Sequence, residues 1–352
     1  MESLCDIIIP VWNELSYTKQ CIDSIYKNTD VPFCLIIIDN GSLEETRSFL
    51  QDLASIHNNI TLITNKENLG YVKAVNQGLK ISQGGYVCLL NNDIVVTKDW
   101  LKKMIDFSEK YPDTGLINCV ENWDKKKPYP PNLEEYARTF EKEKGHYIEL
   151  DHTTGACLLI KRGVIEKIGY LDERFYMGHY EDNDYSYRAK RAGYRCCRLM
   201  DTYVWHYMSS SFNHLQNWRE DIAKKNQRLY EEIWGKSKRI LYITDPIKDY
   251  SLFEKMIIKG HSLAHKGYIV DIYLKEKRDY EAVLNKYDLI HHDFLKLYLM
   301  PRNILILFFE IFKKYKKYRY QSIYIQDQKV FSFLKICRLP VALLSDEKIL
   351  TM

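Results

Sequence analysis

The chain has 352 residues, 46% hydrophobic and 28% charged, which is ordinary globular composition and long enough for two domains. Its formal net charge of +4 is too small to indicate nucleic-acid binding by itself. Nine cysteines without a CxxC pair favour reduced thiols over a disulfide framework or a zinc site. Without a signal-like N-terminus or an apolar run of roughly 20 residues, we expect a cytoplasmic protein.

Strand and helix patterns alternate through the first 90 residues. The predicted strands are residues 6–11, 34–38, 60–64 and 86–90, and the predicted helices are residues 16–28, 43–56 and 71–81. This alternation predicts a mostly parallel sheet flanked by helices. Ligands of such sheets bind beyond the carboxyl ends of the strands, where Asp39, Asn68 and Asp93 fall.

The pattern dissolves between residues 121 and 152, where three prolines stand among lysines. A connection of this length indicates either a functional flap or a disordered linker. Trp123 and residues 125–131 would form an acceptor flap in the first case. Regular structure returns after Gly155, and an amphipathic helix over 213–234 with Gly235 as C-cap is expected to end a first domain, residues 1–235.

Residues 236–352 repeat the alternation and predict a second, smaller Rossmann-like α/β domain. The predicted strands are 239–244, 268–273, 288–292, 322–326 and 340–344, and the predicted helices are 252–266, 280–286, 305–318 and 330–338. Because the pattern stops shortly after a strand, we expect this domain to be reduced or truncated.

Two polar motifs suggest chemistry. The apolar run Leu89-Leu90 ends abruptly in Asn91-Asn92-Asp93, as a buried strand does when it delivers polar side chains to its carboxyl end. The acidic cluster Glu181-Asp182-Asn183-Asp184 precedes a helical pattern. Together they suggest a metal and diphosphate site that faces a carboxylate base. A plain strand-end turn and a solvated helix cap are the alternatives.

An ordered set of motifs resembles family 2 glycosyltransferases over roughly residues 5–235. The motifs are Ile7 to Asn13, Ile38 to Ser42, Asn68-Leu69-Gly70 with Asn76-Gln77-Gly78, Leu90 to Asp93, Thr154-Gly155-Ala156, Gly169 to Phe175, and Glu181 to Asp184 with Arg188. Residues 226–235 look like the closing helix of that family's bacterial cell-surface members. The resemblance implies a GT-A fold, a nucleotide-sugar donor and a divalent metal, Mn²⁺ or Mg²⁺.

The resemblance also implies roles for single residues. Asp182 would be the general base of an inverting transfer, and Asp93 a metal ligand. Asn91 stands where the family's metal motif has a second carboxylate. His206, which follows Asp182 by 206 − 182 = 24 residues, is either a second metal ligand or a satisfied structural histidine. With one carboxylate, the ion is expected to bind together with the donor.

The expected contacts to the nucleotide-sugar surround these positions. Asp39 would accept from the uracil or thymine N3–H, and Gly155 and Ala156 would let the sugar approach the backbone. Lys73 is either a diphosphate contact or a solvated lysine. Ser209 to Ser211 could bind phosphate, and Asp184 is expected to pair with Arg188 along a helix. The full predicted set is Pro10, Val11, Trp12, Asn13, Asp39, Asn68, Gly70, Lys73, Asn91, Asn92, Gly155, Ala156 and Glu181.

The second domain offers weaker signals. Residues 260–273 resemble the opening of a GT-B type glycosyltransferase, but only its amino-terminal half, so no independent catalysis is expected there. Residues 308–319 combine aromatic and basic side chains. They are either a peripheral contact with anionic lipid or a core-packed helix with a solvated basic face.

We therefore expect an inverting, divalent-metal-dependent hexosyl- or N-acetylhexosaminyltransferase. It would move a sugar from a UDP- or dTDP-linked donor to a hydroxyl of a glycan or lipid-linked acceptor in surface polysaccharide synthesis. The site would lie in the cytoplasm, with peripheral contact to the inner face of the membrane as an option. A catalytically weakened, transferase-like scaffold module is the alternative. Nucleotidyltransfer is disfavoured because residues 10–13 lack a Gly- and Lys/Arg-rich loop.

Overall fold

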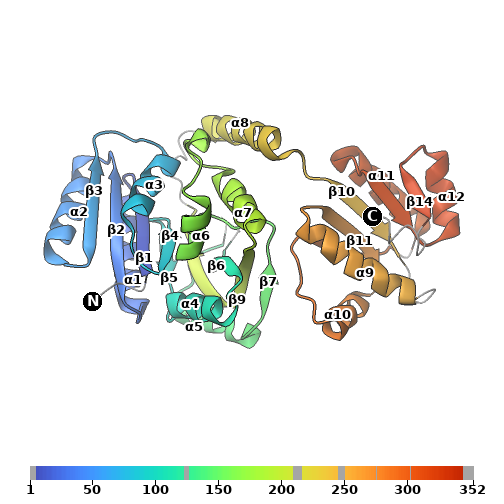
Figure 1. The fold of residues 1–352 in the computed structure, drawn as a ribbon, viewed down its shortest axis with the longest axis horizontal. Coiled ribbons are helices and arrows are strands. Elements are labelled where there is room, and N and C mark those ends of the chain that lie inside the picture. Colours follow the sequence, from blue (N-terminus) through green and yellow to red (C-terminus); the bar gives the residue numbers. More distant parts are fainter. Residues whose placement is uncertain are drawn as a thin grey trace. The chain divides into compact units, whose positions relative to one another are not determined.

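Each half of the chain folds around a sheet of its own. The computed structural model describes residues 5–122, 127–208, 216–244, 250–274, 276–301 and 303–343. Contacts within the chain divide it into two compact units, Met1–Trp234 and Gly235–Met352. In each unit, helices cover both faces of the sheet (Figure 1). Across the described residues, no helix is long and apolar enough to span a membrane.

The first unit is built on a nine-stranded mixed sheet. Its strands are β1 (Cys5–Val11), β2 (Phe33–Asn40), β3 (Ile60–Asn65), β4 (Tyr86–Leu90), β5 (Ile94–Val96), β6 (Thr114–Glu121), β7 (Tyr147–Glu149), β8 (Cys157–Lys161) and β9 (Arg195–His206). The order is β3-β2-β1-β4-β8-β6-β9-β5, and β7 pairs with β9. Strands β1 to β4 are parallel, whereas β8 runs antiparallel to both β4 and β6.

The helices of this unit form two layers. They are α1 (Leu15–Asn28), α2 (Glu44–Ile56), α3 (Tyr71–Ile81), α4 (Trp100–Lys110), α5 (Leu133–Arg138), α6 (Arg162–Ile168), α7 (Glu181–Arg191) and α8 (Gln216–Trp234), with 3₁₀ turns at Glu141–Glu143 and Glu173–Phe175. Apolar residues of α1, α2 and α4 pack on one face, and those of α3, α6 and α7 pack on the other. The three-layer arrangement confirms the predicted α/β class for this half, but the sheet is mixed rather than mostly parallel, because β5, β7 and β8 each run antiparallel to a neighbour.

The segment that looked irregular in sequence is only partly so. Between residues 127 and 152 the chain forms α5, a 3₁₀ turn and β7, which hydrogen-bonds to β9. Trp123 and Lys125 of the predicted flap lie outside the described residues, as do Ser209 to Ser211. The alternative of a disordered linker over the whole of residues 121–152 was therefore wrong. Strand β7 forms because it pairs with β9, and a local sequence pattern does not predict that pairing.

The second unit contains a five-stranded sheet in which every strand pair is parallel. Its strands are β10 (Arg239–Ile243), β11 (Ile269–Leu274), β12 (Leu295–Leu299), β13 (Ser322–Ile325) and β14 (Val341–Leu343), in the order β12-β11-β10-β13-β14. Its helices are α9 (Tyr250–His265), α10 (Lys277–Lys286), α11 (Ile304–Tyr318) and α12 (Gln328–Ile336). Helices α9 and α10 pack on one face, and α11 and α12 on the other.

One predicted strand of this unit was wrong. Residues 288–292 do not form a strand, and β12 begins only at Leu295. The chain is still turning there, because the Leu289 N–H donates to the Leu284 carbonyl and Asp288 has a φ of 51°. Asp288 and Leu289 thus close the end of α10, as a left-handed residue after a helix C-terminus does.

Gly78 makes the contact between α3 and β1 testable. A Cβ at Gly78 would come within 2.7 Å of Cγ2 of Ile8, which is fully buried. We expect Gly78→Ala to lower the free energy of unfolding, because overpacking costs about 1–3 kcal/mol and the gain in helix propensity is about 1 kcal/mol. Chemical denaturation measures it.

Gly260 in α9 is the matched control, because a Cβ there would meet Leu295 at an ordinary 3.4 Å. Gly260→Ala should stabilise its unit or leave it unchanged. A stabilised Gly78→Ala protein would contradict the close packing of α3 on β1.

Candidate active site

The loops after β1 and β2 are tied together at the carboxyl edge of the sheet. The Asn13 N–H donates to Oγ of Ser42 (2.9 Å), and the Leu43 N–H donates to Oδ1 of Asn13 (2.8 Å). Asn13 has a φ of 60°, a left-handed conformation that asparagine tolerates. The segment around Trp12 is therefore held beside the segment that follows Asp39.

Asp39 is fully buried and already has partners. Its Oδ1 accepts from the Ser42 N–H at 2.8 Å, and its Oδ2 lies 3.4 Å from Nε of Arg47. Arg47 was not singled out in the sequence, where it stands on α2 among ordinary surface charges. A carboxylate oxygen accepts more than one hydrogen bond, but the Asp39 side chain is fully buried, so a base could reach it only after a covering group moved.

Asn40, which the sequence analysis also missed, organises the next loop. Its side-chain amide donates to Oδ1 of Asn68 (2.9 Å), and its Oδ1 accepts from the Leu69 N–H (3.0 Å). Oδ1 of Asn68 also accepts from the Gly70 N–H at 2.9 Å. The side chain of Asn68 is thus used to shape the loop, while Lys73 is exposed on α3.

The three polar residues after β4 face different neighbours. The Asn91 N–H donates to the Ala156 carbonyl (2.9 Å), which joins the ends of β4 and β8. The Asn92 amide donates to Oγ1 of Thr18 on α1 (2.9 Å). Asp93 is buried and turns toward the end of β9.

His206 lies between two buried carboxylates. Its Nε2 is 3.2 Å from Oδ1 of Asp93, and its Nδ1 is 2.8 Å from Oε2 of Glu121. Glu121 ends β6 and also accepts from Oγ1 of Thr154 (3.2 Å). The next residue, Asn122, exchanges two hydrogen bonds of 2.8 Å with the backbone of His206. The end of β6 therefore orients both the ring and the main chain of His206.

These carboxylates control the charge of the ring. Burial by itself lowers the pKa of His206, but the hydrogen bonds and charges of Asp93 and Glu121 outweigh it and raise the pKa to about 9. The imidazole is thus protonated at neutral pH and donates to both acids. Glu121 carried no sequence signal, because it stands at the end of a strand that the pattern did not resolve.

A divalent cation fits this corner with a small protein contribution. Among the described residues, no three His, Cys, Asp or Glu side chains are already grouped as a metal site. Oδ1 of Asp93 and Nε2 of His206 are 3.2 Å apart, as two neighbouring ligands of one ion can be once Nε2 gives up the proton that it donates to Asp93. Glu121 would then hold the second ring nitrogen, an arrangement common around metal-bound histidines. Two protein ligands suit an ion that keeps substrate phosphates as the others.

Asp182 begins α7 and its carboxylate is held by backbone donors. Oδ1 accepts from the Asn183 N–H (2.9 Å) and Oδ2 from the Gly155 N–H (3.3 Å). Burial raises the pKa of Asp182, whereas His152 and these two N–H groups act to lower it, and the net direction is upward. The side chain stays partly accessible, as a base that meets a substrate must be.

Glu181 stands beside it in a different environment. It is buried, and within the described part of the chain its Oε2 has no hydrogen-bond partner. Burial first, and then the charge of Asp182, raise the pKa of Glu181 well above its usual range. Its Oε1 would lie 3.7 Å from a Cβ on Gly155, so the carboxyl faces the small residues predicted to admit a sugar.

The turn before α7 is strained. Tyr176, His179 and Tyr180 have φ values of 40°, 67° and 71°. Non-glycine residues in such conformations cost roughly 1–3 kcal/mol each and persist only where the surroundings enforce them. This turn sets the position of Glu181 and Asp182.

Two helices hold the turn in place. On one side, the Val72 N–H donates to the Tyr176 carbonyl (3.1 Å), and a Cβ on Gly70 would come within 2.7 Å of the same oxygen. On the other side, the buried amide of Asn226 in α8 donates to the carbonyls of Phe175 (2.9 Å) and Gly178 (2.7 Å). The closing helix therefore belongs to the site through Asn226.

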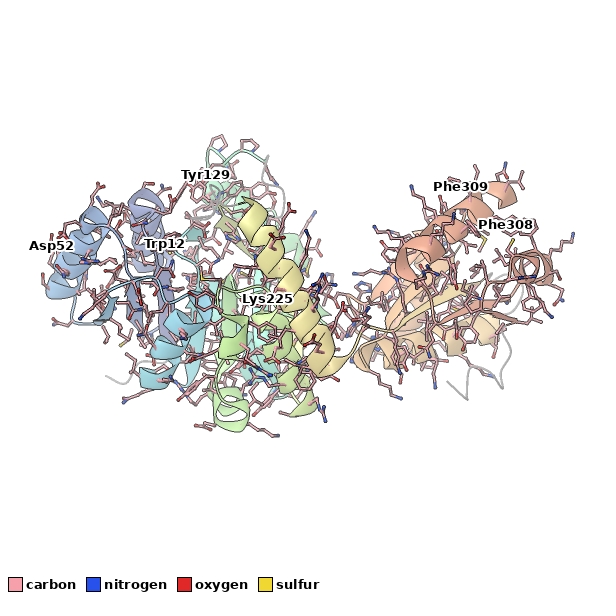
Figure 2. The ribbon with its side chains drawn as sticks, turned by 90° about the horizontal axis from the view of Figure 1, so that it is seen from above. Trp12, Asp52, Tyr129, Lys225, Phe308 and Phe309 are labelled. Carbon is pink, nitrogen blue, oxygen red and sulfur yellow. The ribbon has the colours of Figure 1, made fainter. Side chains whose placement is uncertain are left out.

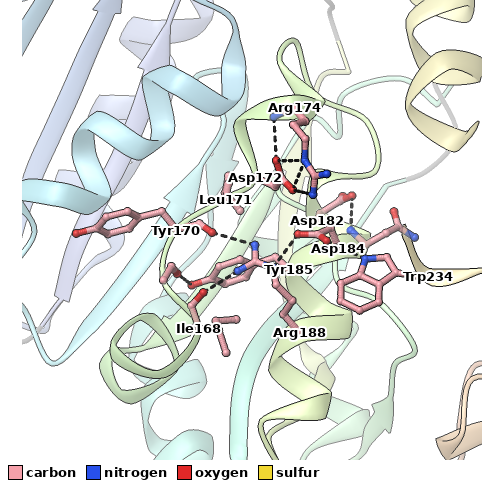
Figure 3. A network of polar contacts seen from close by, with 12 residues as sticks. Ile168, Tyr170, Leu171, Asp172, Arg174, Asp182, Asp184, Tyr185, Arg188 and Trp234 are labelled. Carbon is pink, nitrogen blue, oxygen red and sulfur yellow. Dashed lines mark hydrogen bonds and ion pairs between the residues drawn. The ribbon is translucent and has the colours of Figure 1, made fainter. Parts of the chain in front are cut away.

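Asp184 has a structural role, as its spacing from Arg188 predicted. It accepts from Nε of Arg188 (2.8 Å) and from Nε1 of Trp234 (2.9 Å). Figure 3 shows this network, in which the Arg188 guanidinium also donates to the carbonyls of Ile168 and Tyr170. The predicted pair of Asp184 and Arg188 is confirmed, and it fastens α7 to α8.

Comparisons with known proteins find similarity to glycosyltransferases in the first unit. Residues 6–169 match the model of glycosyl transferase family 2. The putative teichuronic acid biosynthesis glycosyltransferase TuaG of Bacillus subtilis (strain 168) is 32% identical over 104 residues, 30% of this chain and 41% of that protein. The chain spans 27 to 41% of the length of several curated relatives that it matches.

Two solved structures share the fold. A mannosyltransferase from Pyrobaculum calidifontis, in complex with GDP-Man and Mn²⁺, has a TM-score of 0.50 and 20% identity over 67% of this chain and 66% of its own. GalNAc-T7 with UDP, GalNAc and Mn²⁺ has a TM-score of 0.51 and 14% identity over 90% of this chain and 58% of its own.

The expected GT-A fold fits the mixed sheet and both of these glycosyltransferases. The part of the chain that carries Asp39, Asn91 to Asp93 and Gly155 is also the part that matches the family. Residues 6–169 of this chain, just under half of its length, are therefore similar to glycosyl transferase family 2.

Proposed function

We propose that this protein is an inverting glycosyltransferase that uses a nucleotide-diphosphate sugar and a divalent metal. The observation that carries the proposal is a pair of acidic sites in the first unit, whose residues 6–169 are similar to family 2: Asp93 with His206, and Asp182 near the start of α7. The first suits a cation and a diphosphate, and the second suits a base. A UDP- or dTDP-linked donor is proposed because Asp39 can accept from the N3–H of a pyrimidine.

Asp182 would act on the acceptor. It takes the proton from the acceptor hydroxyl while that oxygen bonds to the anomeric carbon and the bond to the diphosphate oxygen breaks. The Asn183 and Gly155 N–H groups keep the carboxylate oriented. The unpartnered Oε2 of Glu181 is proposed to accept from a donor-sugar hydroxyl.

Asp93 and His206 would hold Mn²⁺ or Mg²⁺, with Glu121 behind His206. The ion would supply positive charge opposite the departing diphosphate. Support for manganese comes from the imidazole in the set and from the Mn²⁺ complexes of both structural neighbours. Trp12 and Pro10 would line the base, and Gly155 and Ala156 the sugar.

The acceptor would be a glycan or a lipid-linked saccharide of surface polysaccharide synthesis. Support comes from TuaG, which is named for teichuronic acid biosynthesis. The second unit is proposed to be a Rossmann-like domain similar to the amino-terminal half of GT-B enzymes, because its strands are all parallel.

One observation favours a second candidate, a weakened transferase that serves as a binding module. Asn91 and Asn92 make only structural contacts, and the described residues contain no ready three-ligand metal group. Calorimetry distinguishes the two, since a binding module would show no metal-dependent donor affinity.

Replacing the proposed base should separate chemistry from binding. We expect Asp182→Asn to lower the transfer rate by about 10²–10⁴, because proton removal is lost while donor contacts remain. Transfer assays and UDP calorimetry measure the two effects. Asp52→Asn, the same change at an exposed site on α2, is the control. Near-normal turnover of Asp182→Asn would refute the assignment.

Replacing His152 should shift the pH dependence of kcat/KM. Asp182 works as the carboxylate, so activity falls as the pH drops through its pKa. His152 lowers that pKa, and we therefore expect His152→Asn to move the acid limb of kcat/KM to higher pH. His146→Asn, at an exposed histidine, is the control. An unmoved limb or a shift to lower pH would contradict the electrostatic role of His152.

Glu121 should strengthen the binding of the metal ion. We expect Glu121→Gln to weaken Mn²⁺ binding in the presence of UDP by about 10–100-fold, the usual effect of losing a residue that orients a ligand. Calorimetry measures it, and UDP binding without metal should be unchanged. Glu166→Gln, exposed on α6, is the control. Unchanged Mn²⁺ affinity would show that His206 needs no such support.

A further inference from the structure

Helices α11 and α12 of the second unit bury one side and expose an apolar side. Leu307 and Ile311 of α11 pack into the core with Val330 and Leu334 of α12. On the other side, large apolar residues are exposed: Leu305 (68%), Ile306 (51%), Phe309 (70%), Phe312 (40%) and Phe333 (43%). Soluble surfaces rarely gather so many large apolar side chains without a partner.

The spacing of these residues makes them one surface. Leu305, Phe309 and Phe312 recur at helical intervals of four and three, so they form a stripe along α11. The rings of Phe308 and Phe333 stack with centroids 4.0 Å apart, which joins α11 to α12. Figure 2 labels Phe308 and Phe309 on α11. We call the exposed residues of both helices the α11–α12 face.

Charge distinguishes this segment from the remainder of the chain. Residues 303–338 contain eight Lys or Arg and two Asp or Glu, a net charge of +6 in a chain whose total is +4. Both acids are engaged, since Glu310 accepts from the Tyr273 hydroxyl (2.9 Å) and Asp327 caps α12. The exposed basic residues are Lys313, Lys316, Lys317, Arg319, Lys329, Lys335 and Arg338.

The combination of exposed apolar and exposed basic side chains indicates which kind of partner this face binds. An acidic protein would complement the charge of this face but would leave its phenylalanine side chains exposed to water. A second copy would cover the apolar side chains but bring two strongly basic faces together. A helix that lies in the headgroup region of an anionic bilayer buries its apolar side chains while its lysines contact lipid phosphates. Helix α11, at 15 residues, is too short to cross.

We propose that the α11–α12 face binds the surface of an anionic membrane. Both alternatives left open by the sequence describe part of α11, because Leu307 and Ile311 are core-packed while the opposite side is apolar as well as basic. The proposal goes beyond the transfer reaction and does not depend on it. It would bring a lipid-linked acceptor and the enzyme to the same surface.

Vesicle sedimentation with the full chain tests the proposal. We expect binding to phosphatidylcholine vesicles that contain phosphatidylglycerol, little binding to phosphatidylcholine alone, and weaker binding in high salt. Lys316→Glu with Lys317→Glu should reduce affinity at least tenfold, because each basic residue near an anionic surface contributes about 1 kcal/mol. Lys224→Glu with Lys225→Glu on α8, an equal change at exposed sites, should not.

Leu305→Ser with Phe309→Ser tests the apolar part at exposed positions where folding is not at risk, and it should also reduce binding. Equal sedimentation with both vesicle types, or unchanged binding of the Lys316→Glu, Lys317→Glu protein, would overturn the proposal. So would a dimer in solution that Phe309→Ser dissociates. Asp182→Asn should bind vesicles normally, which keeps this test separate from the proposed chemistry.

Discussion

The candidate base is positioned by a turn whose backbone is unfavourable by itself. Residues 176, 179 and 180 all adopt left-handed conformations, although none is glycine. The turn persists because two segments hold it in place. The Val72 N–H at the start of α3 donates to it and Gly70 lies close against it, while the Asn226 side chain of α8 donates to its carbonyls. Strain of this kind is typical of functional sites, since only the surrounding structure can enforce it. The α8 helix therefore helps to position the candidate base through Asn226, which lies 44 residues beyond Asp182 in the chain.

The proposed metal site, formed by Asp93 and His206 with Glu121 behind, likewise depends on contacts between segments that are distant in the chain. His206 ends β9, Asp93 follows β4 and Glu121 ends β6, so three strands must finish at one place before the imidazole meets both carboxylates. Two acids face one cationic ring, so this place carries a net negative charge that a bound cation can offset. Such a corner favours an ion that arrives with phosphates, because the protein alone offers few oxygen ligands.

The two units of the chain differ in the chemical groups that they bring together. The first holds buried acids at the edge of a mixed sheet, where substrate groups can be activated. The second holds no comparable acidic pair on the α11–α12 face and instead concentrates basic and apolar side chains there. The proposed transfer to a lipid-linked acceptor would use both properties, one from each unit.

The sequence by itself determined the alternating α/β pattern, the family motifs and the short-range pair of Asp184 and Arg188, because these depend on neighbouring residues and local periodicity. It also placed Asp93 and Asp182 at element ends. It missed Glu121, Asn40, Arg47 and Asn226, and it set β12 seven residues too early. Only the tertiary structure decided these, because their roles arise from partners distant in the chain: Glu121 meets His206 across 85 residues. No local pattern encodes such a contact until the strands that carry it are aligned.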